Sequence, residues 1–142
     1  MKFRLLVFGK ASSWVDDGVG QYSTRVPNLV LEQIPGNPVR TRIKRMEAAC
    51  GSRALKVYLD KSGKTFTSES LARRCAAWER QGNDVCLLIG DDKGFTEEDL
   101  SQADLVWSLS PLTLPHQLTR ILVCEQLYRA RSINAGHAYH RS

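Results

Sequence analysis

The chain has 142 residues, of which 42% are hydrophobic and 25% charged, so it is long enough for one domain with a buried core. No apolar run approaches the ~20 residues of a membrane-spanning helix, and no signal-peptide cleavage pattern follows the first strand, which favours the cytoplasm and no membrane partner. Twenty Lys and Arg against fifteen Asp and Glu give a net charge of +5, which permits a phosphate-rich partner without requiring one.

Short apolar runs alternate with segments of helical spacing along the whole chain. Nearly continuous apolar runs are typical of strands that are covered on both faces. The expected strands are Lys2–Gly9, Leu29–Ile34, Ala54–Leu59, Asp84–Ile89 and Leu105–Leu109. The expected helices are Ser13–Arg25, Thr41–Cys50, Ser68–Gln81, Glu97–Ala103 and His116–Ser132. This alternation predicts an α/β fold with a mostly parallel sheet, formed by residues 1–142 as one domain.

Several features of the sequence have simple structural interpretations. Gly18 and Gly20 lie inside an expected helix and not after a strand, so they do not predict a dinucleotide-binding loop. The basic run of Arg40, Arg42, Lys44 and Arg45 is interpreted as a solvated helix face. The four cysteines are Cys50, Cys75, Cys86 and Cys124. Their scattered spacing predicts no metal site and no disulfide framework, so they are interpreted as small core residues.

Two strand ends carry less ordinary sequences, and in parallel sheets ligands bind at the carboxyl ends of strands. In the first, Gly90 and Gly94 enclose Asp91-Asp92-Lys93, which suits either a solvated turn or a close approach to a ligand. The second, Leu109–Leu114, is apolar but includes Ser110 and Thr113. Peptide groups beside apolar side chains suit a purine held by its edge, although a buried connection fits equally well.

The last helix and the residues after it are basic, because no acid follows Glu125. Tyr139, His140 and Arg141 combine an aromatic ring, an imidazole and a guanidinium at the end of the chain. Such groups can stack on a base and hold phosphates. The alternative is an inert chain end.

Motifs in the second half together resemble one known family. They are Leu87-Leu88-Ile89-Gly90, the run Trp107–His116, the run Glu125–Ala130 and Tyr139-His140-Arg141. This pattern is similar to that of the bacterial RlmH family, the large-subunit rRNA pseudouridine N3-methyltransferases of the SPOUT class. The resemblance includes Trp14 and Leu59–Lys64, and it is strongest from Val85 onward.

The resemblance implies a SPOUT-type fold with a C-terminal trefoil knot, a homodimer, S-adenosylmethionine (SAM) as cofactor, and ribosomal RNA of the assembled ribosome as substrate. The implied cofactor positions are Leu59, Gly90, Leu109, Ser110, Pro111, Leu112, Thr113 and Leu114. The implied positions near methyl transfer or the RNA are His116, Arg129, Tyr139, His140 and Arg141. His140 or His116 is expected to assist removal of the N3 proton, and the arginines to hold phosphate or the base.

Two departures from the family pattern concern the site. The family has Gly-Gly-x-x-Gly after the fourth strand, whereas Asp91 replaces the second glycine here. A carboxylate beside that of SAM would repel it by ~1 kcal/mol in water and ~4 kcal/mol near a protein surface, so we expect that either Asp91 points away or SAM binding is weakened. The chain is also shorter than typical members of that family, and the missing residues fall around Pro35–Arg42. These departures motivate two alternatives, a non-catalytic RNA- or ribosome-binding relative and a SAM-dependent enzyme acting on tRNA or another RNA.

Overall fold

The strands and helices expected from the sequence occur in the expected order. The computed structural model describes residues 1–35 and 39–141, with the backbone alone for 39–42. Its strands are β1 (Phe3–Phe8), β2 (Leu29–Ile34), β3 (Leu55–Lys64), β4 (Val85–Ile89) and β5 (Leu105–Trp107). Its helices are α1 (Ser13–Ser23), α2 (Val39–Cys50), α3 (Ser68–Gln81), α4 (Glu97–Leu100) and α5 (His116–Asn134). This alternation of strands and helices confirms the α/β class.

Within the described residues the strands form one parallel sheet in the order β2-β1-β4-β3-β5. Parallel neighbours need crossover connections, which the helices provide. β4 lies between β1 and β3, and all its residues are buried, as the continuous apolar run predicted. The carboxyl ends of the strands therefore meet at one end of the sheet, and the loops that follow them lie there together.

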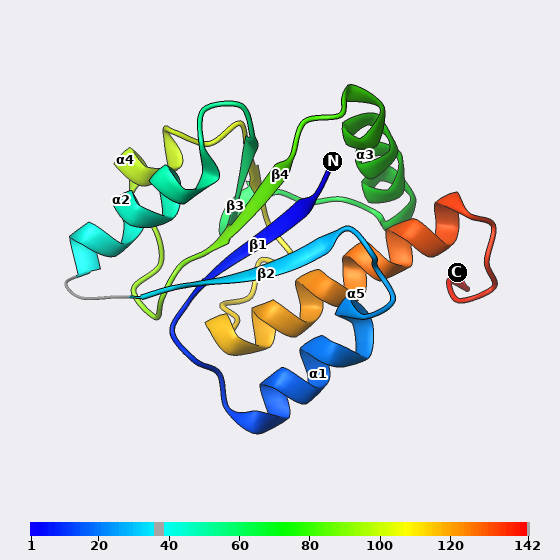
Figure 1. Ribbon diagram of the computed structural model, residues 1–142, viewed down its shortest axis with the longest axis horizontal. Coiled ribbons are helices and arrows are strands. Elements are labelled where there is room, and N and C mark those ends of the chain that lie inside the picture. The colour runs from blue at the N-terminus through cyan, green and yellow to red at the C-terminus, as the bar shows by residue number, and fades with distance from the viewer. Residues whose placement is uncertain (36–38, 142) are drawn as a thin grey trace.

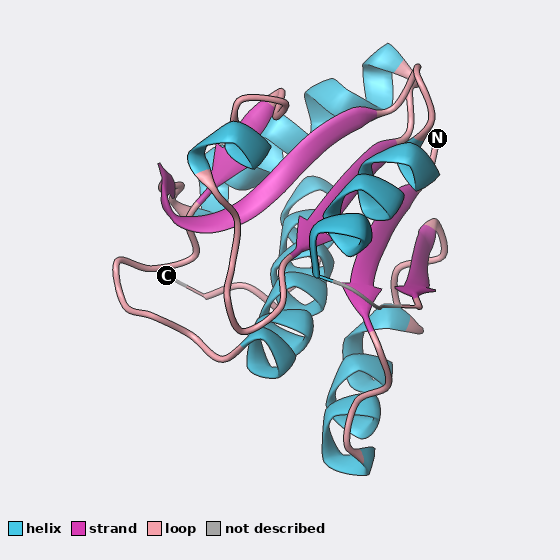
Figure 2. Cartoon of the chain, turned by 90° about the vertical axis from the view of Figure 1, so that its left-hand side faces the viewer, coloured by secondary structure: helices cyan, strands magenta, loops and turns pink. Residues whose placement is uncertain are grey.

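Helices cover both faces of the sheet, so the molecule has three layers (Figure 1, Figure 2). α1, α3 and α5 pack on one face, and α2 and α4 pack on the other. Because side chains alternate along a strand, β1 supplies Leu5 and Val7 to the first core and Leu6 and Phe8 to the second. The sheet is thus buried on both sides.

The expected end of the third strand at Leu59 was wrong, because β3 continues to Lys64. Pairing with β5 is irregular between these two residues. There the carboxylate of Asp60 accepts a hydrogen bond from the N–H of Ser62 at 3.0 Å, which stabilises a local turn within the strand. An apolar pattern cannot reveal a strand whose last residues are polar and half exposed.

Gly63 allows β3 and β5 to approach closely after this irregularity. A Cβ at Gly63 would lie 2.5 Å from the carbonyl carbon and oxygen of Val106. Backbone atoms cannot yield to such a contact as a flexible side chain can, so any larger residue would force the strands apart.

The last helix, α5, buries one face. Of its large apolar side chains, Leu127 is buried, whereas Leu118, Ile121, Leu122 and Tyr128 are half-buried. The buried face also includes Arg120, Val123 and Cys124. α5 packs against both α1 and α3, and Gly18 of α1 leaves room for the Ile121 side chain of α5.

The other expectations about the cysteines and the basic run have mixed outcomes. All four cysteines are buried, which confirms their interpretation as core residues. Lys44 and Arg45 are exposed as expected, whereas the side chains of Arg40 and Arg42 lie outside the described residues, as does most of the shortened region Pro35–Arg42. In residues 1–35 and 39–141, no helix is long and apolar enough to cross a membrane, and no group of three His, Cys, Asp or Glu side chains is placed to hold a metal ion.

Candidate functional site

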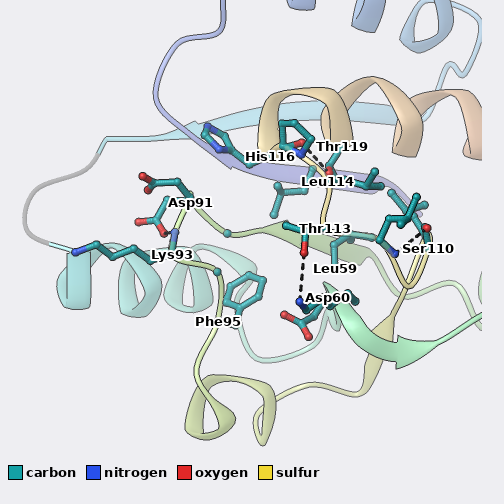
Figure 3. A pocket seen from close by; sticks show the side chains of 18 of the residues that line it. Leu59, Asp60, Asp91, Lys93, Phe95, Ser110, Thr113, Leu114, His116 and Thr119 are labelled. Atoms are coloured by element: carbon teal, nitrogen blue, oxygen red, sulfur yellow. Dashed lines mark hydrogen bonds between the residues drawn. The ribbon is translucent and has the colours of Figure 1, made fainter.

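A cavity of about 840 Å³ opens where β3, β4 and β5 end (Figure 3). Its walls come from the irregular part of β3, the turn after β4, and the segment that joins β5 to α5. Seven of the eight predicted cofactor positions line it, namely Leu59, Gly90, Leu109, Ser110, Leu112, Thr113 and Leu114. Pro111 is exposed and is not among the lining residues. The two unusual strand ends therefore belong to one site.

Asp91 closes the turn after β4. The N–H of Lys93 donates to its carboxylate at 3.0 Å, and the N–H of Gly94 donates to its carbonyl at 2.9 Å. Gly94 has a φ of 67°, the left-handed conformation that favours glycine. A Cβ at Gly90 would lie only 3.3 Å from the Gly94 backbone, so this turn is tightly packed. The Asp91 carboxylate thus lines the cavity while it is bound within its own turn (Figure 3).

The segment between β5 and α5 is fixed by a few polar contacts. The hydroxyl of Ser108 donates to the carbonyl of Ser110 at 2.9 Å, and the N–H of Leu112 donates to the Ser110 hydroxyl at 3.0 Å. The ammonium of Lys61 donates to the hydroxyl of Thr113 at 3.2 Å and so links this segment to β3. The Leu112 side chain is 71% exposed. An ordered loop with an apolar side chain held in solvent is suited to cover a ligand.

The cavity has the size and chemistry of a site for a nucleoside-sized ligand. Its volume falls within the roughly 300–1,000 Å³ typical of small-molecule sites. Leucine side chains and peptide groups line it, and among the described residues the N–H groups of Thr113 and Leu114 have no hydrogen-bond partner. Lys61 and Lys93 line it together with Asp60, Asp91 and Asp92. This mixture suits a ligand that has a flat heteroaromatic ring at one end and both a positively and a negatively charged group at the other.

A buried arginine supports the neighbouring strand end. Arg120 of α5 is 1% exposed, and its guanidinium donates to the carbonyls of Phe8 and Gly9 at the end of β1. Burial lowers the pKa of Arg120, which nearby Asp16 partly opposes. Arg120 therefore satisfies carbonyls that a parallel strand end would leave unpaired, next to Thr119 in the cavity wall.

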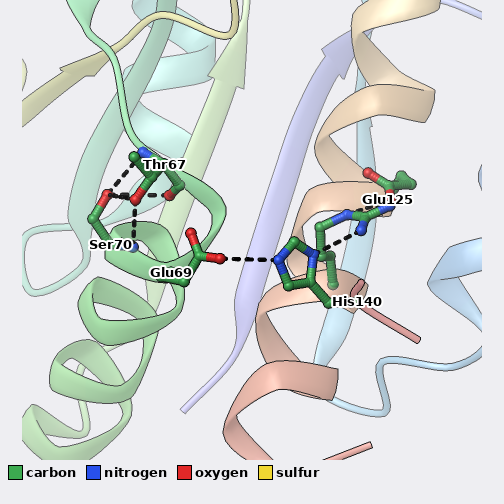
Figure 4. Close-up of polar contacts among 6 residues, drawn as sticks. Thr67, Glu69, Ser70, Glu125 and His140 are labelled. Carbon is green, nitrogen blue, oxygen red and sulfur yellow. Dashed lines mark hydrogen bonds and ion pairs between the residues drawn. The ribbon is translucent and has the colours of Figure 1, made fainter. Parts of the chain in front are cut away.

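The C-terminal residues form a second polar site, the tail cluster of Glu69, Glu125, Arg129, Tyr139 and His140. Arg129 donates to one Glu125 oxygen from Nε at 2.9 Å and from Nη2 at 2.6 Å, and the Tyr139 hydroxyl donates to the same oxygen at 3.1 Å. His140 lies 2.9 Å from Arg129 Nη1 through Nδ1 and 3.0 Å from Glu69 through Nε2 (Figure 4). A guanidinium only donates, so Nδ1 accepts and Nε2–H donates to Glu69.

Electrostatics stabilise the tail cluster in this arrangement. Burial and then the hydrogen bond to Glu125 raise the pKa of Tyr139 to about 12. The hydrogen bond with Glu125 raises the pKa of Arg129. The pKa of Glu69 is lowered, first by its own backbone N–H and then by His140. At neutral pH the Glu69 carboxylate and the Arg129 guanidinium are therefore charged, and the Tyr139 phenol keeps its proton.

The structure divides the five residues expected near the reaction between two places. His116 lines the cavity, whereas Arg129, Tyr139 and His140 belong to the tail cluster. Arg141 is exposed and donates to the carbonyl of Ala138 at 3.4 Å. At a rise of about 1.5 Å per residue, Arg129 lies ~20 Å further along α5 than His116. The two groups therefore do not meet within one chain.

Sequence reasoning missed Glu69, Glu125 and Arg120. Glu125 and Arg129 are four residues apart on one helix, a spacing that could have indicated their ion pair. Glu69 gave no signal, because its partner His140 is 71 residues away. Arg120 gave none either, since nothing in an apolar pattern distinguishes a buried arginine from a solvated one.

Comparisons with known proteins agree with this arrangement. The family model described as predicted SPOUT methyltransferase matches residues 1–140. The chain is 39% identical to the ribosomal RNA large subunit methyltransferase H of Thioalkalivibrio sulfidiphilus, over 99% of both chains. Among solved structures, a probable methylase family protein from Haemophilus influenzae has a TM-score of 0.64 at 11% identity, covering 99% of this chain and 70% of that one. A Legionella pneumophila protein solved with the bound cofactor SAM has a TM-score of 0.50 at 15% identity, covering 92% of this chain and 66% of that one.

Proposed function

Since the chain belongs to the SPOUT methyltransferase family, we propose that it uses SAM to methylate N3 of a pseudouridine in the large-subunit rRNA of the assembled ribosome. The full-length match to relatives named for large-subunit rRNA methylation supports the substrate class. The cavity after β3, β4 and β5 supports the cofactor, because its lining contains seven of the predicted SAM positions.

The residues of the cavity fit SAM. The unpaired N–H groups of Thr113 and Leu114 suit the edge of an adenine ring, and Leu59, Leu109 and Leu112 suit its faces. The rim charges suit the ammonium and carboxylate of the methionine portion. When bound, SAM supplies a methyl group on a positively charged sulfur, a strong electrophile. The protein's contribution is then mainly alignment, which can lower a barrier by ~7–11 kcal/mol.

The reaction also requires the loss of a proton from N3 of the base. N3 would take the methyl group that bound SAM supplies, and the N3 proton would pass to a base. His116 at the cavity is an imidazole that can accept it, directly or through water. His140 could accept it only after its ring nitrogen Nδ1 is released from Arg129. Arg129 and Arg141 would hold phosphate or the base, since guanidinium groups pair readily with phosphate.

We further propose that residues 1–142 act as one methyltransferase domain, that its C-terminal part is knotted, and that the protein is a homodimer acting in the cytoplasm, where ribosomes are. Trp14 and Leu112 support a dimer, because they are large apolar side chains with exposures of 58% and 71%. Exposed apolar groups of this size are common at protein interfaces.

Methyl transfer to ribosomes tests the function directly. We expect labelled methyl to pass from SAM to ribosomes that lack native methylation, and mass spectrometry to identify an N3-methylated pseudouridine. Changing His140→Ala should lower the rate at least about 100-fold, the range of general acid–base catalysis, whereas His137→Ala, an exposed neighbour, should not.

Two other outcomes would contradict the proposal. Transfer to isolated tRNA but not to ribosomes would indicate a different RNA substrate. The absence of both transfer and SAM binding by calorimetry would indicate a non-catalytic RNA-binding protein.

A further inference from the structure

A second, smaller cavity adjoins the segment that follows β5. Its volume is about 270 Å³. Trp107, Leu109, Ser110 and Leu114 line both cavities, so the two cavities adjoin at this segment. The opposite wall consists of residues around the start of α3, including Phe66, and residues of α5, including Gln126. A volume below the roughly 300 Å³ lower bound for drug-sized ligands suits a single base, not a whole cofactor.

The position of this cavity along α5 is informative. His116 and Thr119 of α5 line the first cavity, Leu122 and Gln126 line the second, and Arg129 belongs to the tail cluster. At about 1.5 Å per residue, successive groups are spaced by roughly 5–10 Å along the helix. The second cavity therefore lies between the proposed SAM site and the residues expected to act on the RNA.

The second cavity also contacts the tail cluster through adjacent residues. The amide of Gln126 donates to Glu125 at 2.6 Å, and Glu125 accepts hydrogen bonds from Arg129 and Tyr139. On the facing wall Thr67 caps α3, two residues before Glu69 (Figure 4). A ligand in this cavity would therefore adjoin the Tyr139 and His140 side of the protein.

The edge of the cavity combines an aromatic ring with cations. The Phe66 ring packs edge-on against Trp107, with ring centroids 6.4 Å apart. Lys64 Nζ lies 5.1 Å from the centre of the Phe66 ring and Arg74 Cζ lies 5.6 Å from it. Proteins that bind single-stranded RNA use such rings to stack bases and nearby cations to hold phosphates.

Gln126 can provide the polar recognition that a pyrimidine requires. Among the described residues its side chain makes one hydrogen bond, through the NH₂ group to Glu125, which leaves the amide oxygen able to accept. The N3–H of a uracil-type ring is a donor. A pseudouridine ring has a second donor at N1–H, so a glutamine oxygen that accepts from N1–H can orient the base and leave N3 facing the methyl group.

We propose that this second cavity receives the pyrimidine base that accepts the methyl group, with Phe66 beside the ring, Gln126 at its edge, and Lys64 and Arg74 near the flanking phosphates. The assignment rests on the proposed function. Ser110, which lines both cavities, marks the point where base and cofactor would adjoin.

Three variants test the assignment, namely Phe66→Leu, Gln126→Leu and, as a matched control, Gln102→Leu on the exposed turn after α4. The measurements are kcat/KM for methyl transfer to unmethylated ribosomes and the Kd of SAM by calorimetry. Loss of a base stack or of an oriented hydrogen bond should lower kcat/KM about 10-fold or more, while the Kd of SAM stays within about twofold. Gln102→Leu should behave as the wild type.

Unchanged kcat/KM in both cavity variants would overturn the assignment. A parallel weakening of SAM binding would overturn it too, because the cavity would then belong to the cofactor site. These results differ from failure of the proposed function, in which the wild type itself transfers no methyl to ribosomes.

A crosslinking experiment tests the site without relying on turnover or on the stability of Phe66→Leu. The benzophenone amino acid p-benzoylphenylalanine replaces Phe66, the variant is irradiated with ribosomes, and reverse transcription maps the crosslinked nucleotide. We expect a crosslink at the acceptor nucleotide or its direct neighbour in large-subunit rRNA. Crosslinks only to other regions of the rRNA, or no crosslink at all, would contradict the assignment.

Discussion

Among single residues, Asp91 is where this chain departs most from the family it resembles. Its carboxylate accepts a hydrogen bond from the N–H of Lys93, and its carbonyl accepts one from Gly94. A second glycine would permit this turn because its backbone is flexible. Asp91 instead stabilises the turn before Gly94 through the hydrogen bond of its carboxylate. A carboxylate that is hydrogen-bonded within its own turn repels an anionic ligand group less than a carboxylate that points at that group.

We therefore expect Asp91→Gly and Asp91→Asn to change the Kd of SAM by less than about fivefold, close to 1 kcal/mol. Asp91→Asn is the matched control, because it removes the charge and keeps the hydrogen bond to Lys93. Calorimetric titration with SAM measures both. A gain of tenfold or more in Asp91→Gly would contradict this expectation and would indicate a degenerate cofactor site.

Glu69 provides a test of the tail cluster by pH. Its pKa is lower in the folded protein than the ordinary value of 4.5, through its own backbone N–H and then His140. A carboxyl group whose pKa is lower in the folded than in the unfolded protein stabilises the fold at pH values above its ordinary pKa. This stabilisation is lost as the pH falls through the pKa of the folded protein.

Wild-type protein should thus have a higher Tm than Glu69→Gln at pH 6, and the difference should be smaller at pH 3 than at pH 6. Thermal unfolding followed by circular dichroism gives both values. Glu98→Gln, an exposed acid of α4, serves as the control and should show little difference at either pH. A difference between wild type and Glu69→Gln that does not vary with pH would indicate that Glu69 acts by packing alone.

At the scale of elements, the contact between β3 and β5 depends on Gly63. A methyl group there would meet the Val106 carbonyl at 2.5 Å, so Gly63→Ala should reduce the free energy of unfolding by about 3 kcal/mol. Gly20→Ala is the control, since its Cβ has nothing within 4 Å and lies in helix α1, where alanine should stabilise by about 1 kcal/mol. Urea unfolding measures both. Equal effects of the two changes would show that β5 can shift without cost.

The accuracy of the sequence-based prediction also varies by element. The bounds of α3 were predicted at both ends, because Thr67 caps its start and Gly82 ends it with a φ of 84°. The cavity was predicted from two strand ends, since parallel strands bring their carboxyl ends together. The continuation of β3 to Lys64 was missed because its residues are polar. Arg129, Tyr139 and His140 of the tail cluster were named from the sequence, but Glu69 was missed because its contact with His140 joins residues 71 positions apart, which no local pattern records.

At the scale of the whole molecule, the proposed homodimer gives a direct prediction. Sedimentation equilibrium at micromolar concentration should give about twice the chain mass of 16.0 kDa. Trp14→Glu should shift the equilibrium toward the monomer if this exposed ring lies at the interface, whereas Val30→Glu, another exposed apolar position, should not. A wild-type mass of one chain across the concentration range would rule out the dimer.

The strand order has a consequence for the synthesis of the chain. β4 occupies the place between β1 and β3, although the ribosome makes both of those strands first. The buried face of α5 then completes the first core, and α5 is the last element to be made. A nascent chain must therefore hold β1 and β3 apart, with apolar surface uncovered, for the several seconds that the remaining residues take at ~5–20 residues per second. Premature truncation within α5 should leave an aggregating fragment and not a smaller working protein.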